Sequence, residues 1–308
     1  MLWEKKGLIY APDQNFWWSQ HYGILPTPVY LPEKEVIRVY FGTTDKDRNS
    51  RITFIDVDAF NPSIIFYQHN HFILDIGEIG YFDDSGAVPS AIVDVNGESF
   101  LYYVGFQRTE KVPSMLFIGL ATSVNYLDFQ RKTLFPLLDR SLSESISNGA
   151  AFVLFQDNKF KMWFWASKQW IYVDSKLYLQ ATIFYAESNN GLNWTIAPTP
   201  CITYDNDKEF SVGRPWIVYQ HNIYEMFYSI RYKDKLYRLG YATSQDGITW
   251  ERKDHEIGID VSPTGWDSEM ICYPAVITVH NRTYLFYNGN GNGKTGFGYA
   301  ELIKDATS

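Results

Sequence analysis

The stretch YATSQDGITW at residues 241–250 recurs in close variants elsewhere in the chain. Residues 120–129 read LATSVNYLDF, residues 185–194 read YAESNNGLNW, and a truncated copy, YAEL, begins at Tyr299. The alanines at the second positions of these copies are 65, 56 and 58 residues apart. A weaker copy, TFIDVDAFNP, begins at Thr53. A constant period of about 60 residues indicates a fold made of repeated units, and five such units account for the whole chain.

Each unit contains further elements in a fixed order. A small residue or proline opens an apolar stretch, as in PTPV at 26–29, PSAI at 89–92, AFVL at 151–154, PWIV at 215–218 and PAVI at 274–277. A polar turn follows, and then an aromatic stretch of alternating pattern: FLYYVGF, FKMWFWAS, YEMFYSI or TYLFYNG. The alternation and the Asn, Asp and Gly turns predict one short strand after another.

Four short strands per unit, repeated around an axis, are typical of a β-propeller blade. We therefore predict an all-β fold, a five-bladed β-propeller of four-stranded antiparallel blades, as one domain over residues 1–308. The expected blades are 13–66, 80–135, 144–200, 208–258, and 265–303 together with 1–12. The last unit supplies only three strands, while WEKK at residues 3–6 resembles WERK at residues 250–253. The N-terminal strand is thus expected to complete the C-terminal blade and close the ring.

Composition limits the classes of function. Hydrophobic residues make up 45% of the chain and aromatic residues 18%, which supports a large core and excludes general disorder. The net charge of −8 disfavours non-specific binding to nucleic acid or anionic membranes. No signal peptide and no apolar run long enough to span a membrane is apparent, and Cys201 and Cys272 are too few for a disulfide framework. A cytoplasmic protein is expected.

The ends of the innermost strands of a propeller meet at one face, so the residue five positions before each aligned proline is a candidate site residue. This residue is His21 in the first unit, Asp84 in the second and Glu269 in the fifth. Asp84 lies in FDDSG at 82–86 and Glu269 in GWDSE at 265–269, which also contain Asp83, Ser85 and Asp267. Two carboxylates facing each other could act as acid and base, or as base and nucleophile, in sugar chemistry. The alternative is that these carboxylates bond turns in the backbone.

Arginines form a second candidate group. Arg214 lies at the mouth of the fourth blade, and Arg48 and Arg51 follow Asp45 in a loop of the first. A guanidinium group can clamp a carboxylate or phosphate at two points, or it can form an ion pair at the rim, and we favour the ion pair for Arg231. No His or Cys spacing indicates a metal site, and no cofactor is indicated, although a central cation is left open.

The loop GNGNGKT at 289–295 superficially resembles a phosphate-binding loop. Position 288 is Asn where that motif needs Gly, and a strand-like sequence follows instead of a helix. We therefore expect a connecting loop, from which Asn288 could still reach a ligand at the channel mouth. Four tryptophans are candidate platforms for a sugar ring: Trp17, Trp18, Trp165 and Trp266.

These motifs together resemble the five-bladed β-propeller glycosidase-like superfamily, which includes glycoside hydrolase families 43, 32, 62 and 130. The blade mark Ser-x-Asp-Gly-x-x-Trp occurs at 244–250, with a variant at 188–194. The stretches YFGT at 40–43, FDDSG at 82–86, GRP at 213–215, GWDSEMICYP at 265–274 (which contains Tyr273) and YNGN at 287–290 are similar to glycosidase-like proteins associated with bacterial surface polysaccharides.

The resemblance implies a sugar-handling site at the channel mouth. Family 43 uses Asp, Asp and Glu in its first three blades, whereas this chain offers His21, Asp84 and Asn148 there. Family 130 uses one carboxylate and a basic phosphate cradle, for which His21, Arg48 and Arg214 are candidates. The implied ligand is a sugar, an oligosaccharide, a sugar phosphate or a nucleotide sugar.

Two functions remain open on the sequence. The first is an enzyme acting on glycosidic bonds (a hydrolase, a phosphorylase or a glycosyltransferase) in bacterial surface-polysaccharide metabolism, with Asp84 and Glu269 catalytic. The second is a non-catalytic sugar-binding or scaffold protein of polysaccharide assembly.

Overall fold

The computed structural model describes residues 1–140 and 145–303, and it is almost entirely β-structure. One sheet of eight strands comes from the N-terminal part of the chain. Its strands are β2 (His21–Leu31), β3 (Val36–Thr44), β4 (Ser50–Asp58), β5 (Ile65–Gln68), β6 (Gly86–Val95), β7 (Glu98–Arg108), β8 (Ser114–Ser123) and β9 (Gln130–Arg131). Only one residue pair, Ser50 with Gly86, joins β4 to β6, so the sheet consists of two four-stranded groups linked at a single point.

Three four-stranded sheets follow. The first contains β10 (Ser147–Gln156), β11 (Lys159–Val173), β12 (Lys176–Ser188) and β13 (Thr195–Ile196). The second contains β14 (Glu209–Gln220), β15 (Ile223–Tyr232), β16 (Arg238–Ser244) and β17 (Glu251–Arg252). The third contains β18 (Cys272–Val279), β19 (Arg282–Asn288), β20 (Phe297–Leu302) and β1 (Trp3–Tyr10). The helical content that the structure describes is limited to Pro32–Lys34, Asp254–Glu256 and the one-turn α1 (Asn290–Gly293).

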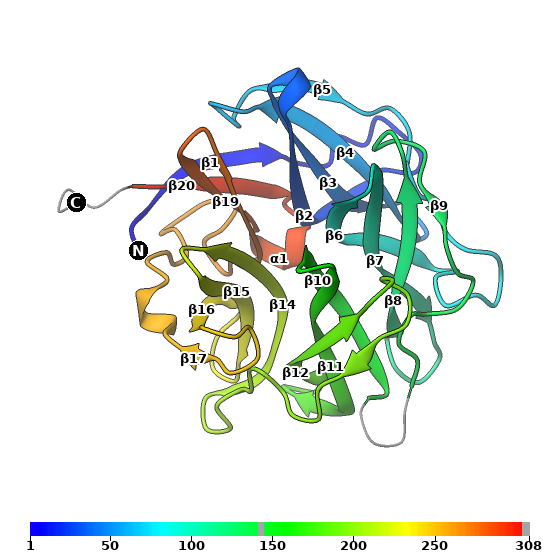
Figure 1. Cartoon of the computed structure of the whole chain (residues 1–308), viewed down its shortest axis with the longest axis vertical. Coiled ribbons are helices and arrows are strands. Elements are labelled where there is room, and N and C mark those ends of the chain that lie inside the picture. The colour runs from blue at the N-terminus through cyan, green and yellow to red at the C-terminus, as the bar shows by residue number, and fades with distance from the viewer. Residues whose placement is uncertain (141–144, 304–308) are drawn as a thin grey trace.

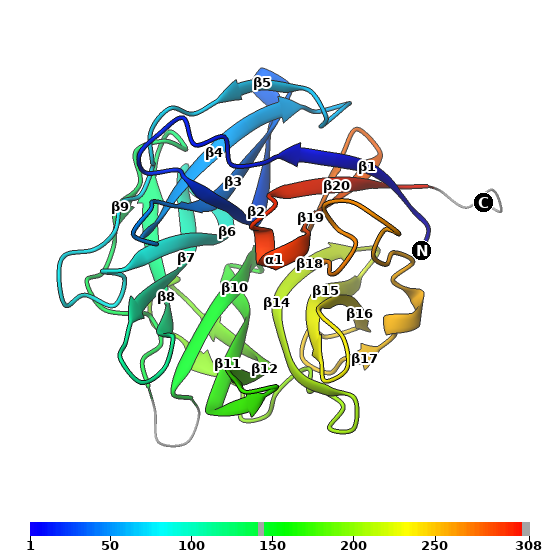
Figure 2. The ribbon, with the colours of Figure 1, turned by 180° about the vertical axis from the view of Figure 1, so that it is seen from behind.

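The sheets are arranged around a common centre. Strands β2, β6, β10, β14 and β18 contact one another in sequence, and β18 contacts β2 in turn. These five strands lie nearest the centre in the views from both sides (Figure 1, Figure 2). The N-terminal strand β1 pairs antiparallel with β20, with Trp3 opposite Leu302, which confirms the expected completion of the C-terminal sheet.

The repeated sequence element links adjacent sheets. In the copy at 241–250, the Ser244 hydroxyl accepts from the Gly247 N–H at 2.8 Å, and Gly247 adopts a positive φ of 76°. The Gly247 carbonyl then accepts from the indole N–H of Trp163 at 2.7 Å. Trp163 is fully buried and belongs to β11 of the preceding sheet. The small residues of the repeat therefore form a turn whose backbone satisfies a buried tryptophan of the neighbouring unit.

Each of the five inner strands carries a β-bulge near the aligned proline or alanine, and in β6 it lies at Ser90, just after the proline. The registers shift between Ile24 and Thr27, Pro89 and Ala91, Gly149 and Phe152, Gly213 and Trp216, and Cys272 and Ala275. In four of these strands a bulge residue has a positive φ between 45° and 57°: Leu25, Ala150, Arg214 and Tyr273. A bulge leaves one residue unpaired and turns its side chain away from the sheet. The bulges thus determine which side chains face the centre.

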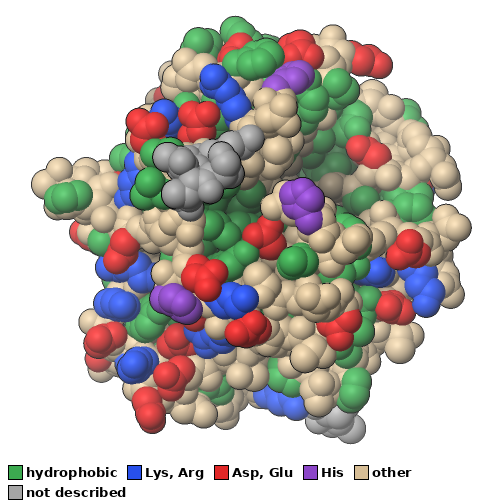
Figure 3. Space-filling view, turned by 60° about the vertical axis from the view of Figure 1, so that its left-hand side comes forward, with side chains coloured by type: hydrophobic (Ala, Val, Ile, Leu, Met, Phe, Trp, Pro, Cys, Tyr) green, Lys and Arg blue, Asp and Glu red, His purple; other side chains and the backbone are tan. Residues whose placement is uncertain are grey.

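No helix within the described ranges is long and apolar enough to cross a membrane. Both cysteine thiols, at Cys201 and Cys272, are free. Figure 3 shows acidic and basic side chains intermixed over one face of the molecule instead of separated into patches of one sign. This face offers no basic surface of the kind that nucleic acid requires.

Closure by β1 should contribute strongly to stability. The Trp3 side chain is 7% exposed, and its indole N–H donates to the Ile257 carbonyl at 2.8 Å. We expect Trp3→Ala to lower the free energy of unfolding by about 3–5 kcal/mol, because it leaves a cavity and an unpaired carbonyl. Urea unfolding followed by circular dichroism measures this, and Leu2→Ala, at a side chain 51% exposed, is the control. Equal losses in the two variants would contradict a closing role for β1.

Candidate functional site

A cavity of about 440 Å³ lies at the centre of the inner strands. The residue immediately before the aligned proline or alanine lines the cavity in every unit: Leu25, Val88, Ala150, Arg214 and Tyr273. Four of these residues are the bulge residues with positive φ. The bulges therefore build this cavity, and the repeat places one side chain from each unit in its wall.

Aromatic side chains form much of the remaining wall. Trp165 and Trp170 come from β11, Tyr178 from β12, and Tyr237 from the connection between β15 and β16. Trp170 and Tyr178 belong to the long hairpin of β11 and β12, which extends past the end of β10. Pockets of this size and apolar character commonly hold small ligands, and flat rings suit the apolar face of a sugar.

Arg214 is the central charged group of the cavity. Its side chain is 1% exposed and connects three inner strands, because Nη1 donates to the Ser90 carbonyl of β6 and Nη2 donates to the Pro26 carbonyl and the Thr27 hydroxyl of β2. Its Nε has no partner among the described residues. Burial lowers the pKa of Arg214 to about 9, which leaves the side chain cationic at neutral pH.

Arg231, at the end of β15, is the second cation of the cavity. Its guanidinium carbon lies 5.0 Å from the ring centre of Tyr178 and 4.7 Å from that of Tyr237, and its Nε donates to the Tyr237 hydroxyl. The rim ion pair expected for Arg231 is not formed: across the described ranges neither this residue nor Arg214 makes a salt bridge. Two guanidinium groups therefore share one cavity without a carboxylate partner from the part of the chain that the structure describes.

The two carboxylates proposed as catalytic lie outside the lining of this cavity. Asp84 is half-buried just before β6 and accepts from the Gly80 N–H at 3.0 Å, the Ser85 hydroxyl at 2.9 Å and the Gln107 amide at 3.3 Å. Glu269 is exposed before β18, and its backbone N–H is held by Asn290 at 2.8 Å. No hydrogen bond joins Asp84 to Glu269 among the contacts that the described residues make.

The neighbouring acidic residues lock strands together within each sheet. Asp83 is fully buried and binds the Tyr103 hydroxyl at 2.9 Å and Arg131 Nε at 2.8 Å. Asp267 likewise binds the Tyr287 hydroxyl at 2.9 Å and Lys5 at 2.7 Å. In both sheets the tyrosine comes from the second strand and the base from the fourth. The acidic residue before the inner strand recurs in these two units because the same contact, a carboxylate bound to a tyrosine and a basic side chain, recurs in both sheets.

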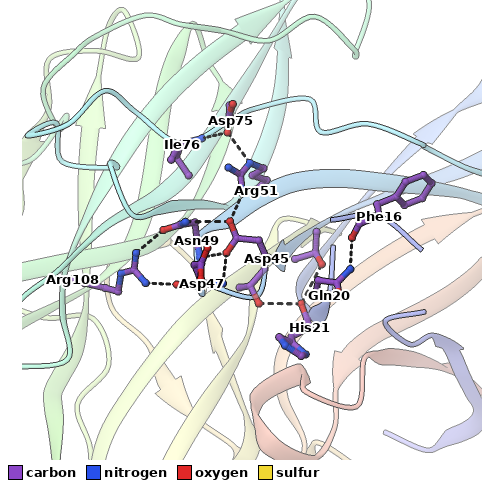
Figure 4. A network of polar contacts seen from close by, with 12 residues as sticks. Phe16, Gln20, His21, Asp45, Asp47, Asn49, Arg51, Asp75, Ile76 and Arg108 are labelled. Carbon is purple, nitrogen blue, oxygen red and sulfur yellow. Dashed lines mark hydrogen bonds and ion pairs between the residues drawn. The ribbon is translucent and has the colours of Figure 1, made fainter. Parts of the chain in front are cut away.

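Asp45 and Arg51 belong to a polar network of the first unit, drawn in Figure 4. Asp45 accepts from the N–H groups of Asp47 and Asn49, both at 2.9 Å, and from Arg51 Nη1 at 2.9 Å. Arg51 also binds Asp75 at 2.7 Å. These contacts stabilise the turn between β3 and β4, in which the side chain of Arg48 is exposed. His21, at the start of β2, is also exposed.

Three further candidates make structural bonds. Ser85 accepts from the Arg108 N–H at 3.1 Å. Asn148 is buried between the Ile118 N–H, at 3.2 Å, and the Leu138 carbonyl, at 3.0 Å. Asn288 is fully buried, accepts from the Leu25 N–H at 2.9 Å, and donates to the carbonyls of Gly23 and Gly296. Asn288 thereby joins β19 to β2. The strand expected after this segment is β20, whereas the one-turn α1 within the expected loop was not predicted from the sequence.

Of the thirteen candidate residues, the structure places Arg214 and Tyr273 in the cavity. The residue that lines the cavity lies one position before each aligned proline or alanine, so the alignment could have located these residues. Their side chains are chemically unlike, however, and suggest no common role. Arg231, Tyr178 and Trp170 carry no repeat signal at all. No group of three His, Cys, Asp or Glu gathers as a metal site in residues 1–140 and 145–303.

Comparison with known proteins gives the family. No family model matches the chain. The uncharacterized protein Rv1502 of Mycobacterium tuberculosis H37Rv is 32% identical over 302 residues, which cover 98% of this chain and 99% of that protein. The corresponding protein of strain CDC 1551, MT1551, matches equally. This chain belongs to the Rv1502 family. The match extends over all the sheets, so the similarity covers the complete fold and is not limited to one segment.

Solved structures show the same fold at lower identity. The BT0996 protein in its RGII complex has a TM-score of 0.78 at 18% identity, covering 99% of this chain and 93% of that one. A structure from the GH130 family of mannoside phosphorylases, described as containing glycoside hydrolases that target β-1,2 mannosidic linkages, has a TM-score of 0.73 at 14% identity over 98% and 94%. A thermostable family-43 glycoside hydrolase has a TM-score of 0.66 at 16% identity over 96% and 94%. The fold is that of the glycosidase-like propellers.

The network around Asp45 predicts acid sensitivity. Burial opposes ionisation of Asp45, but the Asn49 N–H and Arg51 outweigh it and hold the pKa of this carboxyl below its usual value. The stabilisation is therefore complete above about pH 4 and is lost as the pH falls through the folded-state pKa. Asp45→Asn, which turns an amide donor toward Arg51, should cost about 1–3 kcal/mol at pH 7 and less in acid.

Urea unfolding of both proteins between pH 7 and pH 2 measures this difference. Asp47→Asn is the control, because Asp47 lies in the same turn with an exposed side chain. A difference between wild type and Asp45→Asn that stays constant with pH would contradict the assignment.

Proposed function

We propose that the protein binds a carbohydrate in its central cavity. The observation that carries the proposal is the composition of the wall: aromatic rings from β11, β12 and the β15–β16 connection surround a space of about 440 Å³ at the point where the inner strands converge. Sugar rings present an apolar face of C–H groups, and this face packs well against indole and phenol rings. The fold shared with glycosidase-like propellers supports the same conclusion.

Catalysis on a glycosidic bond is the second candidate function. It is supported by the position of Asp84 and Glu269, which lie just before the inner strands β6 and β18. The lining of the cavity argues for binding alone, because its described residues include no Asp or Glu and glycosidases place two carboxylates across the bond they cleave. Binding is therefore the primary proposal, and hydrolysis, phosphorolysis or transfer depends on whether Asp84 and Glu269 reach a ligand that extends beyond the cavity.

The number of blades and the cellular role are also proposals. We interpret the eight-stranded sheet as two blades divided at the Ser50–Gly86 pair, which makes the molecule a five-bladed propeller with one inner strand per blade. We further propose a cytoplasmic role in surface-polysaccharide metabolism, where sugar phosphates and nucleotide sugars are the available ligands.

Substitution of one wall residue tests the binding site. Trp170→Ala removes an aromatic surface from the cavity and should weaken binding of a cognate oligosaccharide about 5- to 150-fold, since loss of one stacked ring costs about 1–3 kcal/mol. Isothermal titration measures the affinity. Tyr172→Ala is the matched control, because Tyr172 lies on the same hairpin with 74% of its side chain exposed and does not line the cavity. Equal effects of the two substitutions would exclude the cavity as the binding site.

Substitution of Asp84 separates catalysis from binding. If the protein is an enzyme, Asp84→Asn should lower turnover about 10²–10⁴-fold and leave sugar affinity within a factor of about three. Mass spectrometry of products from oligosaccharides, with and without phosphate, measures turnover. Glu78→Gln, at an exposed carboxylate of the same loop, is the control. Undiminished turnover in Asp84→Asn would remove Asp84 from the mechanism, and no turnover in wild type with intact binding would establish the binding role.

A further inference from the structure

We propose that the sugar bound in the central cavity carries an anionic group, a carboxylate or a phosphate, that Arg231 binds this group, and that the buried charge of Arg214 attracts it. This inference rests on the proposed function and names the class of carbohydrate. It starts from the unbalanced charge of the cavity, whose described lining holds two guanidinium groups and no carboxylate.

A buried cation without a counter-ion is costly. Charges removed from water are normally paired, because the desolvation of an isolated ion costs several kcal/mol that neutral partners only partly offset. Arg214 has lost nearly all contact with solvent, yet its partners are two carbonyls and a hydroxyl, and no described residue pairs with its Nε. Arg214 also adopts a φ of 52°, a backbone conformation that is strained for a side chain of this kind.

Arg231 adds a second positive charge to the same wall. Its guanidinium lies against the rings of Tyr178 and Tyr237, which favour a cation but do not neutralise it. Two like charges in a cavity with apolar walls raise each other's electrostatic energy. A ligand that brings one or two negative charges relieves both the repulsion and the desolvation.

The other polar groups of the lining are suited to an acceptor. As far as the structure describes the chain, the lining contains no Asp, Glu, Asn, Gln or His; its polar side chains are Arg214, Arg231, Tyr178, Tyr237, Tyr273, Ser114, Ser211, Ser229, Trp165 and Trp170. Burial raises the pKa of Tyr237 and Tyr273, so both hydroxyls stay protonated. The Ser211 and Ser229 hydroxyl oxygens already accept backbone N–H groups, which leaves their protons free to donate.

A neutral sugar would be poorly matched to these groups. Its hydroxyls can bond to the serine and tyrosine hydroxyls, which accept as well as donate, but it brings no negative charge to offset the two guanidinium groups. A carboxylate or phosphate accepts only, and an arginine binds it through charge-assisted bonds. The anionic group thus accounts for the arginines, and the aromatic wall accounts for the sugar ring.

Titration of the full chain with a set of probes tests the inference. The probes are glucose, mannose, glucuronate, glucose 1-phosphate, mannose 1-phosphate and inorganic phosphate, used at low salt. At least one charged sugar should bind tenfold or more tightly than its neutral parent, and the comparison of glucuronate with the phosphates identifies the anion. Arg231→Gln should weaken that binding about 10- to 100-fold.

Two further variants keep the test specific. Lys235→Gln changes the net charge equally but lies on the exposed loop after β15, so it should leave binding unchanged. Arg231→Lys retains the charge without the two-point geometry and should give an intermediate affinity, and it replaces Arg231→Gln if that variant fails to fold.

The outcomes separate this inference from the function on which it rests. Neutral sugars that bind as tightly as charged ones, with no effect of Arg231→Gln, would overturn the anionic ligand and leave carbohydrate binding intact. Binding of inorganic phosphate that depends on Arg231, with no gain from any sugar, would support the anion site and overturn the carbohydrate proposal. Failure of every probe to bind would overturn both.

Discussion

The placement of the Arg214 guanidinium at the centre of the molecule is the constraint on which the arrangement of the inner strands depends. One side chain from β14 reaches the backbone of β6 and of β2, so three of the five inner strands are held by a single planar group. Arginine is suited to this position because its five donors fan out in one plane. At Arg214 the strand also has a bulge, which leaves this residue unpaired and redirects its side chain.

Among the described residues, buried charged side chains form ion pairs within the sheets but not at the centre of the molecule. Within the sheets, buried carboxylates are paired: Asp83 with Arg131, Asp267 with Lys5, and Glu209 with Arg252, each to a base on the fourth strand of its own sheet. In two of these sheets the fourth strand, β9 or β17, is only two residues long, so the ion pair adds a contact to a short ladder. At the centre the cations lack such partners within the described ranges. The difference between the paired peripheral charges and the unpaired central ones is the basis for the proposed anionic ligand.

The repeat architecture separates stability from function. The turn of the Ser-x-Asp-Gly-x-x-Trp element links two adjacent sheets, and the tyrosine and carboxylate lock occurs in two sheets, where both features stabilise the fold. The position just before the aligned proline or alanine lines the cavity in all units but carries a different side chain in each, from alanine to arginine and tyrosine. Because the side chain at this repeated position differs from unit to unit, the cavity wall is chemically different on each side, although the surrounding strands are alike.

The sequence by itself determined the strand order, the position of the repeats and the pairing of β1 with β20, because alternation, turn residues and the Trp-Glu motif are local signals. It also offered Arg214 as an arginine at the mouth of the fourth blade, and Tyr273 through the family resemblance. It did not distinguish the structural carboxylates Asp83 and Asp267 from ligand-binding groups, because acidic residues before a strand have the same sequence signature in both roles. Only the tertiary structure decided which side chains share the cavity, since bulges displace the register by a residue and Arg231 and Trp170 reach the centre from outside the repeat.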